Sequence, residues 1–90
     1  MIIETSIIVP SYNSELTIKK TLNSIISQKY VKWECIIIDD FSNDNSVKII
    51  EEICDKNKNF KLIKLLYNQG VSNARNVGID NSKGKYICFL

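Results

Sequence analysis

The sequence predicts an α/β fold in which helices cover both faces of a mostly parallel, four-stranded sheet. Strand-like and helix-like segments alternate along the chain, beginning and ending with a strand. The strand segments are almost continuously apolar, which is typical of parallel strands buried on both faces. Right-handed crossovers then place helices on the two faces and give three layers. Ninety residues suit one domain, so residues 1–90 are expected to form a single unit.

The first strand is predicted at residues 6–9, a β-branched run that we expect Pro10 to stop. A helix should follow over residues 15–28, with Asn13 and Ser14 as N-cap candidates. Its apolar stripe is formed by Leu16, Ile18, Leu22, Ile25 and Ile26.

The second strand is predicted at residues 34–38 and ends in Asp39 and Asp40. Polar turn and cap residues then lead into a second helix, which we expect over residues 44–55. Residues 60–66 form the third predicted strand.

A third helix is predicted after the turn at residues 68–70, and it should end at residues 82–84. Its inner face is marked by Val71, Ala74, Val77 and Gly78. The chain closes with a fourth predicted strand at residues 85–90, which we expect to leave an uncovered apolar edge.

The amino-acid composition excludes several classes of protein. Twelve Lys and Arg against ten Asp and Glu give a charge of +2, too balanced to predict a nucleic-acid partner. The absence of His from the sequence excludes His-based catalysis within it. Three widely spaced cysteines predict free thiols in a reducing compartment, and no apolar run reaches membrane-spanning length. We therefore expect a cytoplasmic, bacterial protein, with a peripheral position at the inner membrane face left open.

Ligands of open parallel sheets bind beyond the carboxyl ends of the strands. Paired carboxylates at Asp39 and Asp40 occupy such a strand end, where they are costly unless something uses them. A nucleobase offers N–H donors to a carboxylate, and Tyr12 offers a ring for stacking. No GxGxxG or Walker A loop is present, so a dinucleotide oxidoreductase or P-loop NTPase is disfavoured.

Four blocks in order resemble the amino-terminal part of family 2 glycosyltransferases, which have the Rossmann-like GT-A fold. The blocks are residues 6–13, 27–42, 68–78 and 83–90. The resemblance covers essentially the whole chain, and it implies a binding site for a nucleotide-diphosphate sugar.

The resemblance also implies roles for individual residues. Tyr12 would stack on the base, and the backbone of Pro10 and Ser11 would line the edge of the base. Asp40 would accept a hydrogen bond from the base imide N–H, while Asp39 would support the turn.

Two more residues are assigned to the nucleotide by the same resemblance. Arg75, the only arginine, would face the nucleotide from the third helix, and Glu15 would lie on the ribose side of the nucleotide.

The expected activity of the intact protein is transfer of a sugar, with inversion, to a sugar, lipid or protein acceptor. The family's Asp-x-Asp motif is expected immediately after Leu90, so the ligands for Mn²⁺ or Mg²⁺ should lie beyond it, as should the catalytic base. The 90 residues alone are expected to bind nucleotide weakly and not to turn over.

Other interpretations remain open at this point. Asp39 and Asp40 would also suit a solvated turn that caps the next helix. A receiver-like signalling domain shares the βα alternation, although its acid pair follows the first strand. A non-catalytic interaction module is the third alternative, with self-association through the last strand.

Overall fold

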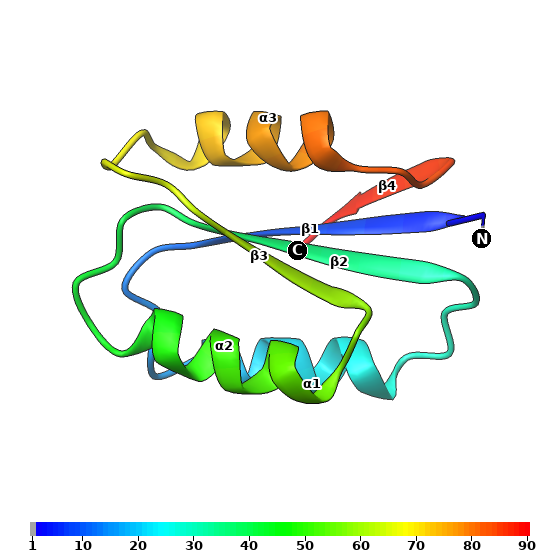
Figure 1. Cartoon of the computed structure of the whole chain (residues 1–90), viewed down its shortest axis with the longest axis horizontal. Coiled ribbons are helices and arrows are strands. Elements are labelled where there is room, and N and C mark those ends of the chain that lie inside the picture. Colours follow the sequence, from blue (N-terminus) through cyan, green and yellow to red (C-terminus); the bar gives the residue numbers. More distant parts are fainter. Residues whose placement is uncertain (1) are drawn as a thin grey trace.

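The computed structural model describes residues 2–90 as seven regular elements, coloured along the chain in Figure 1. The elements in order are β1 (Thr5–Ser11), α1 (Ile18–Ser27), β2 (Trp33–Asp39), α2 (Ser46–Lys56), β3 (Phe60–Lys64), α3 (Val71–Asn81) and β4 (Tyr86–Phe89). The predicted alternation of strands and helices is confirmed.

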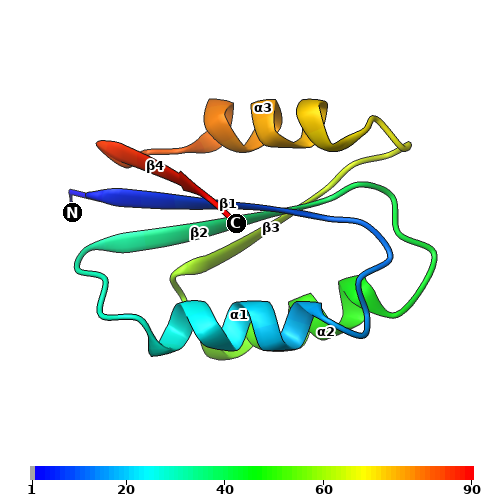
Figure 2. The same ribbon diagram turned by 180° about the vertical axis from the view of Figure 1, so that it is seen from behind.

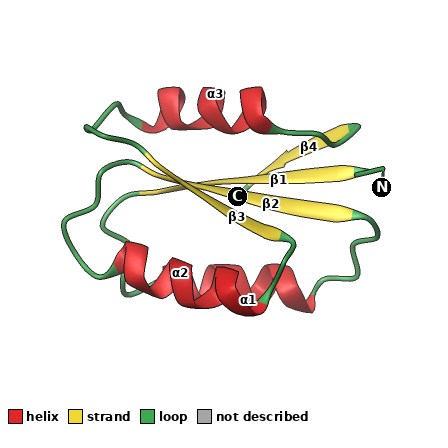
Figure 3. Cartoon of the chain, viewed as in Figure 1, coloured by secondary structure: helices red, strands yellow, loops and turns green. Residues whose placement is uncertain are grey.

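The four strands form one parallel sheet in the order β3-β2-β1-β4. Helices α1 and α2 cover one face and α3 covers the other, as both Figure 1 and the reverse view in Figure 2 show. The three-layer α/β/α fold class is therefore confirmed. The carboxyl ends of β1, β2 and β3 lie together at one edge of the sheet, at the left of Figure 3, and the amino ends lie at the opposite edge.

Alternation along the central strands builds two cores. Ile7 and Val9 of β1 pack with the helical stripe of α1 and α2, whereas Ile8 packs with Ala74 of α3. β2 divides in the same way, because Ile37 joins the first core and Ile36 joins the second. Each fully buried aliphatic side chain contributes about 1.5–3 kcal/mol relative to exposure, so these strands anchor the sheet.

The expectation that Pro10 stops the first strand is wrong. β1 continues to Ser11, and Pro10 pairs in register with Ile38 of β2. The oxygen of Ile8 accepts a hydrogen bond from Leu90 N on the β4 side, and alternate residues of a strand point the same way. The missing N–H of Pro10 therefore faces the β4 side, beyond the last paired residue of β4, and breaks no bond to β2.

The first helix also begins later than predicted. α1 starts at Ile18, and its N-cap is Thr17 rather than Asn13 or Ser14. Leu16 lies in the preceding turn and is 94% exposed, so it does not belong to the apolar stripe, and Ile26 is likewise exposed. The buried face of α1 consists of Ile18, Leu22 and Ile25.

Smaller differences concern the other boundaries. α2 begins at Ser46 instead of residue 44, and β3 ends at Lys64, leaving Leu66 exposed. Within residues 2–90, none of the helices is both long and apolar enough to span a bilayer.

Candidate functional site

A pocket of about 320 Å³ opens where β1 and β2 end and α3 begins. It is lined by Pro10, Ser11, Tyr12, Asp40, Asn68, Gly70, Val71 and Ala74. The walls come from the end of β1, from the three loops after β1, β2 and β3, and from the first turns of α3. This is the crevice at which the sheet topology places ligands.

Asp40 is the one acidic residue of the pocket lining, and it is held by backbone groups. Its side chain is 5% exposed, and its Oδ1 and Oδ2 accept hydrogen bonds from Gln69 N at 2.7 Å and Gly70 N at 2.9 Å. These donors lie at the start of α3, where the helix dipole favours a negative charge. Each carboxylate oxygen has a second acceptor site, so Asp40 retains the capacity to accept a further hydrogen bond from a ligand.

Asp39 lies behind the pocket and shapes the turn that carries Asp40. The Asp39 carboxylate is 2% exposed and accepts hydrogen bonds from Ser42 N at 2.9 Å and Ser42 Oγ at 2.6 Å. The turn between them includes Phe41 at a φ of 65°, a conformation that most residues avoid. The two carboxylates are therefore each satisfied by their own donors, which removes the cost of placing them side by side.

Tyr12 stands at the rim of the pocket and is 52% exposed. Its loop is fixed on both sides of the ring. The hydroxyls of Ser11 and Ser14 share a hydrogen bond of 2.6 Å, and Asn13 N donates to Ser42 Oγ at 2.8 Å. The ring is thus presented to the pocket by a loop that is tied to the loop after β2.

Glu15 and Arg75 are not among the pocket-lining residues. The Glu15 carboxylate accepts a hydrogen bond from Asn45 N at 3.3 Å and so belongs to the contact between two loops. The Arg75 guanidinium lies 5.9 Å from the centre of the Phe89 ring, against β4. The structure therefore brings together Pro10, Ser11, Tyr12 and Asp40, with Asp39 as their support.

Four lining residues were not predicted as site residues: Asn68, Gly70, Val71 and Ala74. The signal for the first two was available, because they follow the third strand at the same edge of the sheet. Asn68 also donates from Nδ2 to Asp40 O at 3.2 Å, which joins the third loop to the second. Ala74 is fully buried against the sheet and had been interpreted only as core.

The residues present do not fit a metal centre. Over residues 2–90, no three Cys, Asp or Glu side chains come together as metal ligands. Asp39 and Asp40 hold their hydrogen-bond donors instead.

Comparison with known proteins identifies the family of this chain. The family model described as glycosyl transferase family 2 matches residues 6–90. The chain belongs to this family. The resemblance seen in the four sequence blocks is confirmed, and family 2 membership decides against a receiver domain.

Curated relatives of this family 2 chain are longer proteins. It is 45% identical over 85 residues to an uncharacterized glycosyltransferase of Haemophilus influenzae, covering 94% of this chain and 34% of the relative. It is 39% identical to the UDP-Glc:alpha-D-GlcNAc-diphosphoundecaprenol beta-1,3-glucosyltransferase WfgD of Escherichia coli, covering 94% of this chain and 33% of WfgD. The chain thus spans about a third of the length of these relatives.

Solved structures agree with the family 2 fold. S. aureus TarS 1-349 in complex with UDP-GlcNAc superposes with a TM-score of 0.91 and 34% identity, over 98% of this chain and 26% of TarS. A mannosyltransferase of Pyrobaculum calidifontis, in complex with GDP-Man and Mn²⁺, gives a TM-score of 0.88 at 22% identity over 97% of this chain and 26% of its own. The second likeness concerns the fold alone.

Proposed function

We propose that residues 2–90 form the donor-nucleotide-binding part of a glycosyltransferase. The intact enzyme would transfer a sugar from a nucleotide-diphosphate donor to an acceptor hydroxyl, with inversion, in bacterial polysaccharide or glycoconjugate synthesis. The observation that carries the proposal is the pocket, in which Tyr12 and Asp40 meet at the carboxyl ends of the strands. Its support is the likeness to TarS, which has been solved with UDP-GlcNAc and with UDP.

The pocket suggests a division of labour among its residues. Tyr12 stacks on the base, because its exposed ring borders an otherwise largely apolar wall. Asp40 accepts the imide N–H of the base through the lone pairs that Gln69 and Gly70 leave free. Pro10 and Ser11 line the edge of the base, and Asp39 keeps the Asp40 turn in place.

Glu15 and Arg75 complete the proposal on the ribose and nucleotide sides. Each needs to change its present contact to reach a ligand, because Glu15 holds Asn45 N and Arg75 lies against Phe89. Their contributions to affinity should therefore be smaller than those of Tyr12 and Asp40.

The remaining parts of the reaction are assigned outside these residues. The acceptor oxygen bonds to the anomeric carbon as the bond to the diphosphate breaks, and a carboxylate base takes the hydroxyl proton. That base, the Mn²⁺ or Mg²⁺ ligands and the acceptor site are proposed to lie beyond Leu90. A cytoplasmic location, with the enzyme peripheral at the membrane, also stays a prediction.

Self-association through the last strand stays a prediction as well. β4 is an edge strand, and its Ile87 and Phe89 side chains are exposed. A molar mass that stays that of the monomer over a wide concentration range in light scattering would contradict it.

Titration with UDP tests the proposed function. Backbone NMR signals of the pocket loops should shift, and calorimetry should give a saturable isotherm. Tyr12→Ala should weaken binding about tenfold, as expected for the loss of base stacking, while Tyr12→Phe should change it little. Asp40→Asn should also weaken binding, and Asp80→Asn on the exposed side of α3 is the matched control. Unshifted pocket signals at millimolar UDP would overturn the proposal.

A further inference from the structure

A second pocket lies at the opposite edge of the sheet, where the strands begin. It has a volume of about 330 Å³ and is called the Trp33 pocket below. Its lining residues are Ile3, Trp33, Glu34, Lys58, Asn59, Lys61 and Lys83. The proposed nucleotide pocket lies at the other end of the strands and shares none of these residues.

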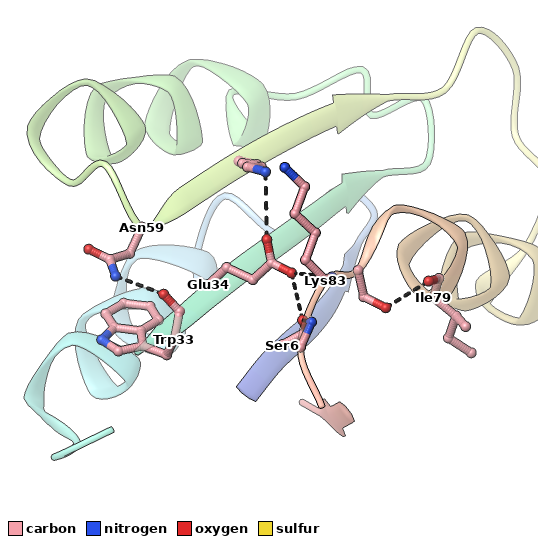
Figure 4. A network of polar contacts seen from close by, with 9 residues as sticks. Ser6, Trp33, Glu34, Asn59, Ile79 and Lys83 are labelled. Atoms are coloured by element: carbon pink, nitrogen blue, oxygen red, sulfur yellow. Dashed lines mark hydrogen bonds and ion pairs between the residues drawn. The ribbon is translucent and has the colours of Figure 1, made fainter. Parts of the chain in front are cut away.

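The Trp33 pocket is built around a buried carboxylate, shown in Figure 4. Glu34 is 3% exposed, and its Oε2 accepts hydrogen bonds from Ser6 Oγ at 2.6 Å and Lys83 N at 2.7 Å. Its Oε1 lies 3.6 Å from the ammonium of Lys61. Burial alone raises the pKa of Glu34, but the hydrogen bonds from Ser6 and Lys83 and the charge of Lys61 outweigh it, so the pKa is lowered. Glu34 therefore stays ionised at neutral pH.

Positive charge exceeds negative charge in the lining. The lining contains three lysines, Lys58, Lys61 and Lys83, and the single carboxylate of Glu34, which leaves two positive charges in excess. Within residues 2–90, the ammonium groups of Lys58 and Lys83 form no ion pair. In Figure 4 the side chain of Lys83 extends past the carboxylate of Glu34. A dianion would neutralise this excess.

The loops around the Trp33 pocket are also positively charged. The three loops at the amino ends of the strands, residues 28–32, 57–59 and 82–85, contain five lysines and no acidic residue. The three loops at the carboxyl ends, residues 12–17, 40–45 and 65–70, contain no lysine or arginine. Electrostatic attraction therefore directs anions toward the amino-end edge of the sheet.

Trp33, the first residue of β2, borders the pocket. Its ring packs edge-on against Phe60, with the centroids 5.4 Å apart, and Asn59 Nδ2 donates to Trp33 O at 2.8 Å. Ile3 adds a second apolar surface. The pocket is larger than a single phosphate group, so it has room for an apolar or sugar portion beside the anion.

We propose that the Trp33 pocket binds the phosphate group of an anionic ligand, with the remainder of that ligand against the indole ring. Lys58, Lys61 and Lys83 would contact the phosphate oxygens, which suit several ammonium donors at once. The phosphate would belong either to a soluble phosphorylated molecule or to a lipid headgroup. This site is independent of the proposed nucleotide pocket and does not rest on it.

Fluorescence gives a direct test, because Trp33 is the only tryptophan of the chain. Titration with glycerol phosphate and with pyrophosphate should change the Trp33 emission in a saturable way. Lys58→Gln and Lys83→Gln should each weaken binding about fivefold, the upper range for an exposed ion pair. Lys48→Gln, which removes an exposed lysine of α2 outside the pocket, is the matched control. Equal losses in all three variants would mean general charge attraction and overturn the proposal.

Vesicles distinguish the two sources of phosphate. If the ligand is a headgroup, vesicles of phosphatidylglycerol in phosphatidylcholine should shift the Trp33 emission, and phosphatidylcholine alone should not. If it is soluble, glycerol phosphate should saturate the signal without vesicles. Tyr12→Ala should leave either response unchanged, which separates this site from the proposed nucleotide pocket. No response of Trp33 to millimolar phosphate compounds or to the vesicles would overturn the proposal.

Discussion

Glu34 near the start of β2 and Asp40 directly after its end are both buried carboxylates, and they are held in different ways. At the carboxyl end, both oxygens of Asp40 accept hydrogen bonds from backbone N–H groups of the loop before α3. At the amino end, Glu34 is held by a hydroxyl, one backbone N–H and a lysine. No lysine lines the pocket that Asp40 borders, whereas three lysines line the pocket that contains Glu34.

Because the two carboxylates are held differently, we expect Asp40 to matter mainly for ligand binding and Glu34 mainly for the stability of the fold. The donors of Asp40 come from neighbouring positions of one loop, so the carboxylate orders that loop and still faces the pocket. The donors of Glu34 come from β1, β3 and the loop before β4, so the carboxylate joins three parts of the chain. Substitutions at the carboxyl end should mainly change ligand affinity, and those at the amino end should mainly change the free energy of unfolding.

Glu34→Ala should give the largest effect on stability. The hydroxyl of Ser6 and the N–H of Lys83 lose their buried acceptor, so the free energy of unfolding should fall by about 3 kcal/mol. Glu52→Ala, at an exposed position of α2, is the control and should change it by less than about 0.5 kcal/mol. Urea denaturation measures both. A loss of UDP affinity by the folded Glu34→Ala protein would break the comparison between the two ends.

Gly84 at the amino end and Gly70 at the carboxyl end test the same difference between the two ends of the sheet. A Cβ at Gly84 would lie 2.6 Å from the backbone N of Ser6, whereas Gly70 has open space around it but a φ of 89°. Gly84→Ala and Gly70→Ala should each cost about 2 kcal/mol, the first through crowding and the second through backbone strain.

The two glycine variants should differ in ligand binding. Gly70 N holds Asp40, so Gly70→Ala should weaken UDP binding in calorimetry, and Gly84→Ala should not. If both variants bind UDP equally well while folded, Gly70 does not position Asp40 for the ligand.

Acid should weaken the contacts of Glu34 at the amino end, and this should be the smallest of the three effects. The folded-state pKa of Glu34 lies below its ordinary value of 4.5. Its stabilisation is therefore present above that value and is lost as the pH falls through the folded-state pKa. Between pH 6 and pH 3, the free energy of unfolding should fall more steeply in the wild type than in Glu34→Gln. Parallel pH profiles from urea denaturation would show that Glu34 carries no such linkage.

The sequence predicted what depends on local pattern. Nearly continuous apolar runs predicted the strands, and the rule for carboxyl ends of parallel strands predicted Tyr12 and Asp40 as neighbours. The position of the Arg75 side chain could not be predicted from the sequence pattern. This residue follows the buried Ala74, and one residue rotates a helix by about 100°, so Arg75 points away from the pocket toward Phe89.

The local sequence pattern does not predict contacts between loops that are distant in the sequence. Glu15 and Leu16 continue the helical spacing, yet Ser14 N donates to Ser46 Oγ and Glu15 N donates to Asp44 Oδ2. These bonds fix the backbone before α1 in a turn. Pro10 was misjudged for a related reason, because its tolerance depends on which neighbour its missing N–H faces.

The sheet order β3-β2-β1-β4 has a consequence for how the chain folds during synthesis. β1 is synthesised before the other three strands, but one of its two sides pairs only with β4, the last of the four along the sequence. The bond from Gly84 N to Ser6 Oγ closes over 78 positions of sequence. Such distant pairing slows folding, because the entropy of closing the loop is lost before the contacts form. One side of β1 therefore has no strand partner until residues 86–89 emerge, and during this interval the unpaired side of β1 is exposed to aggregation.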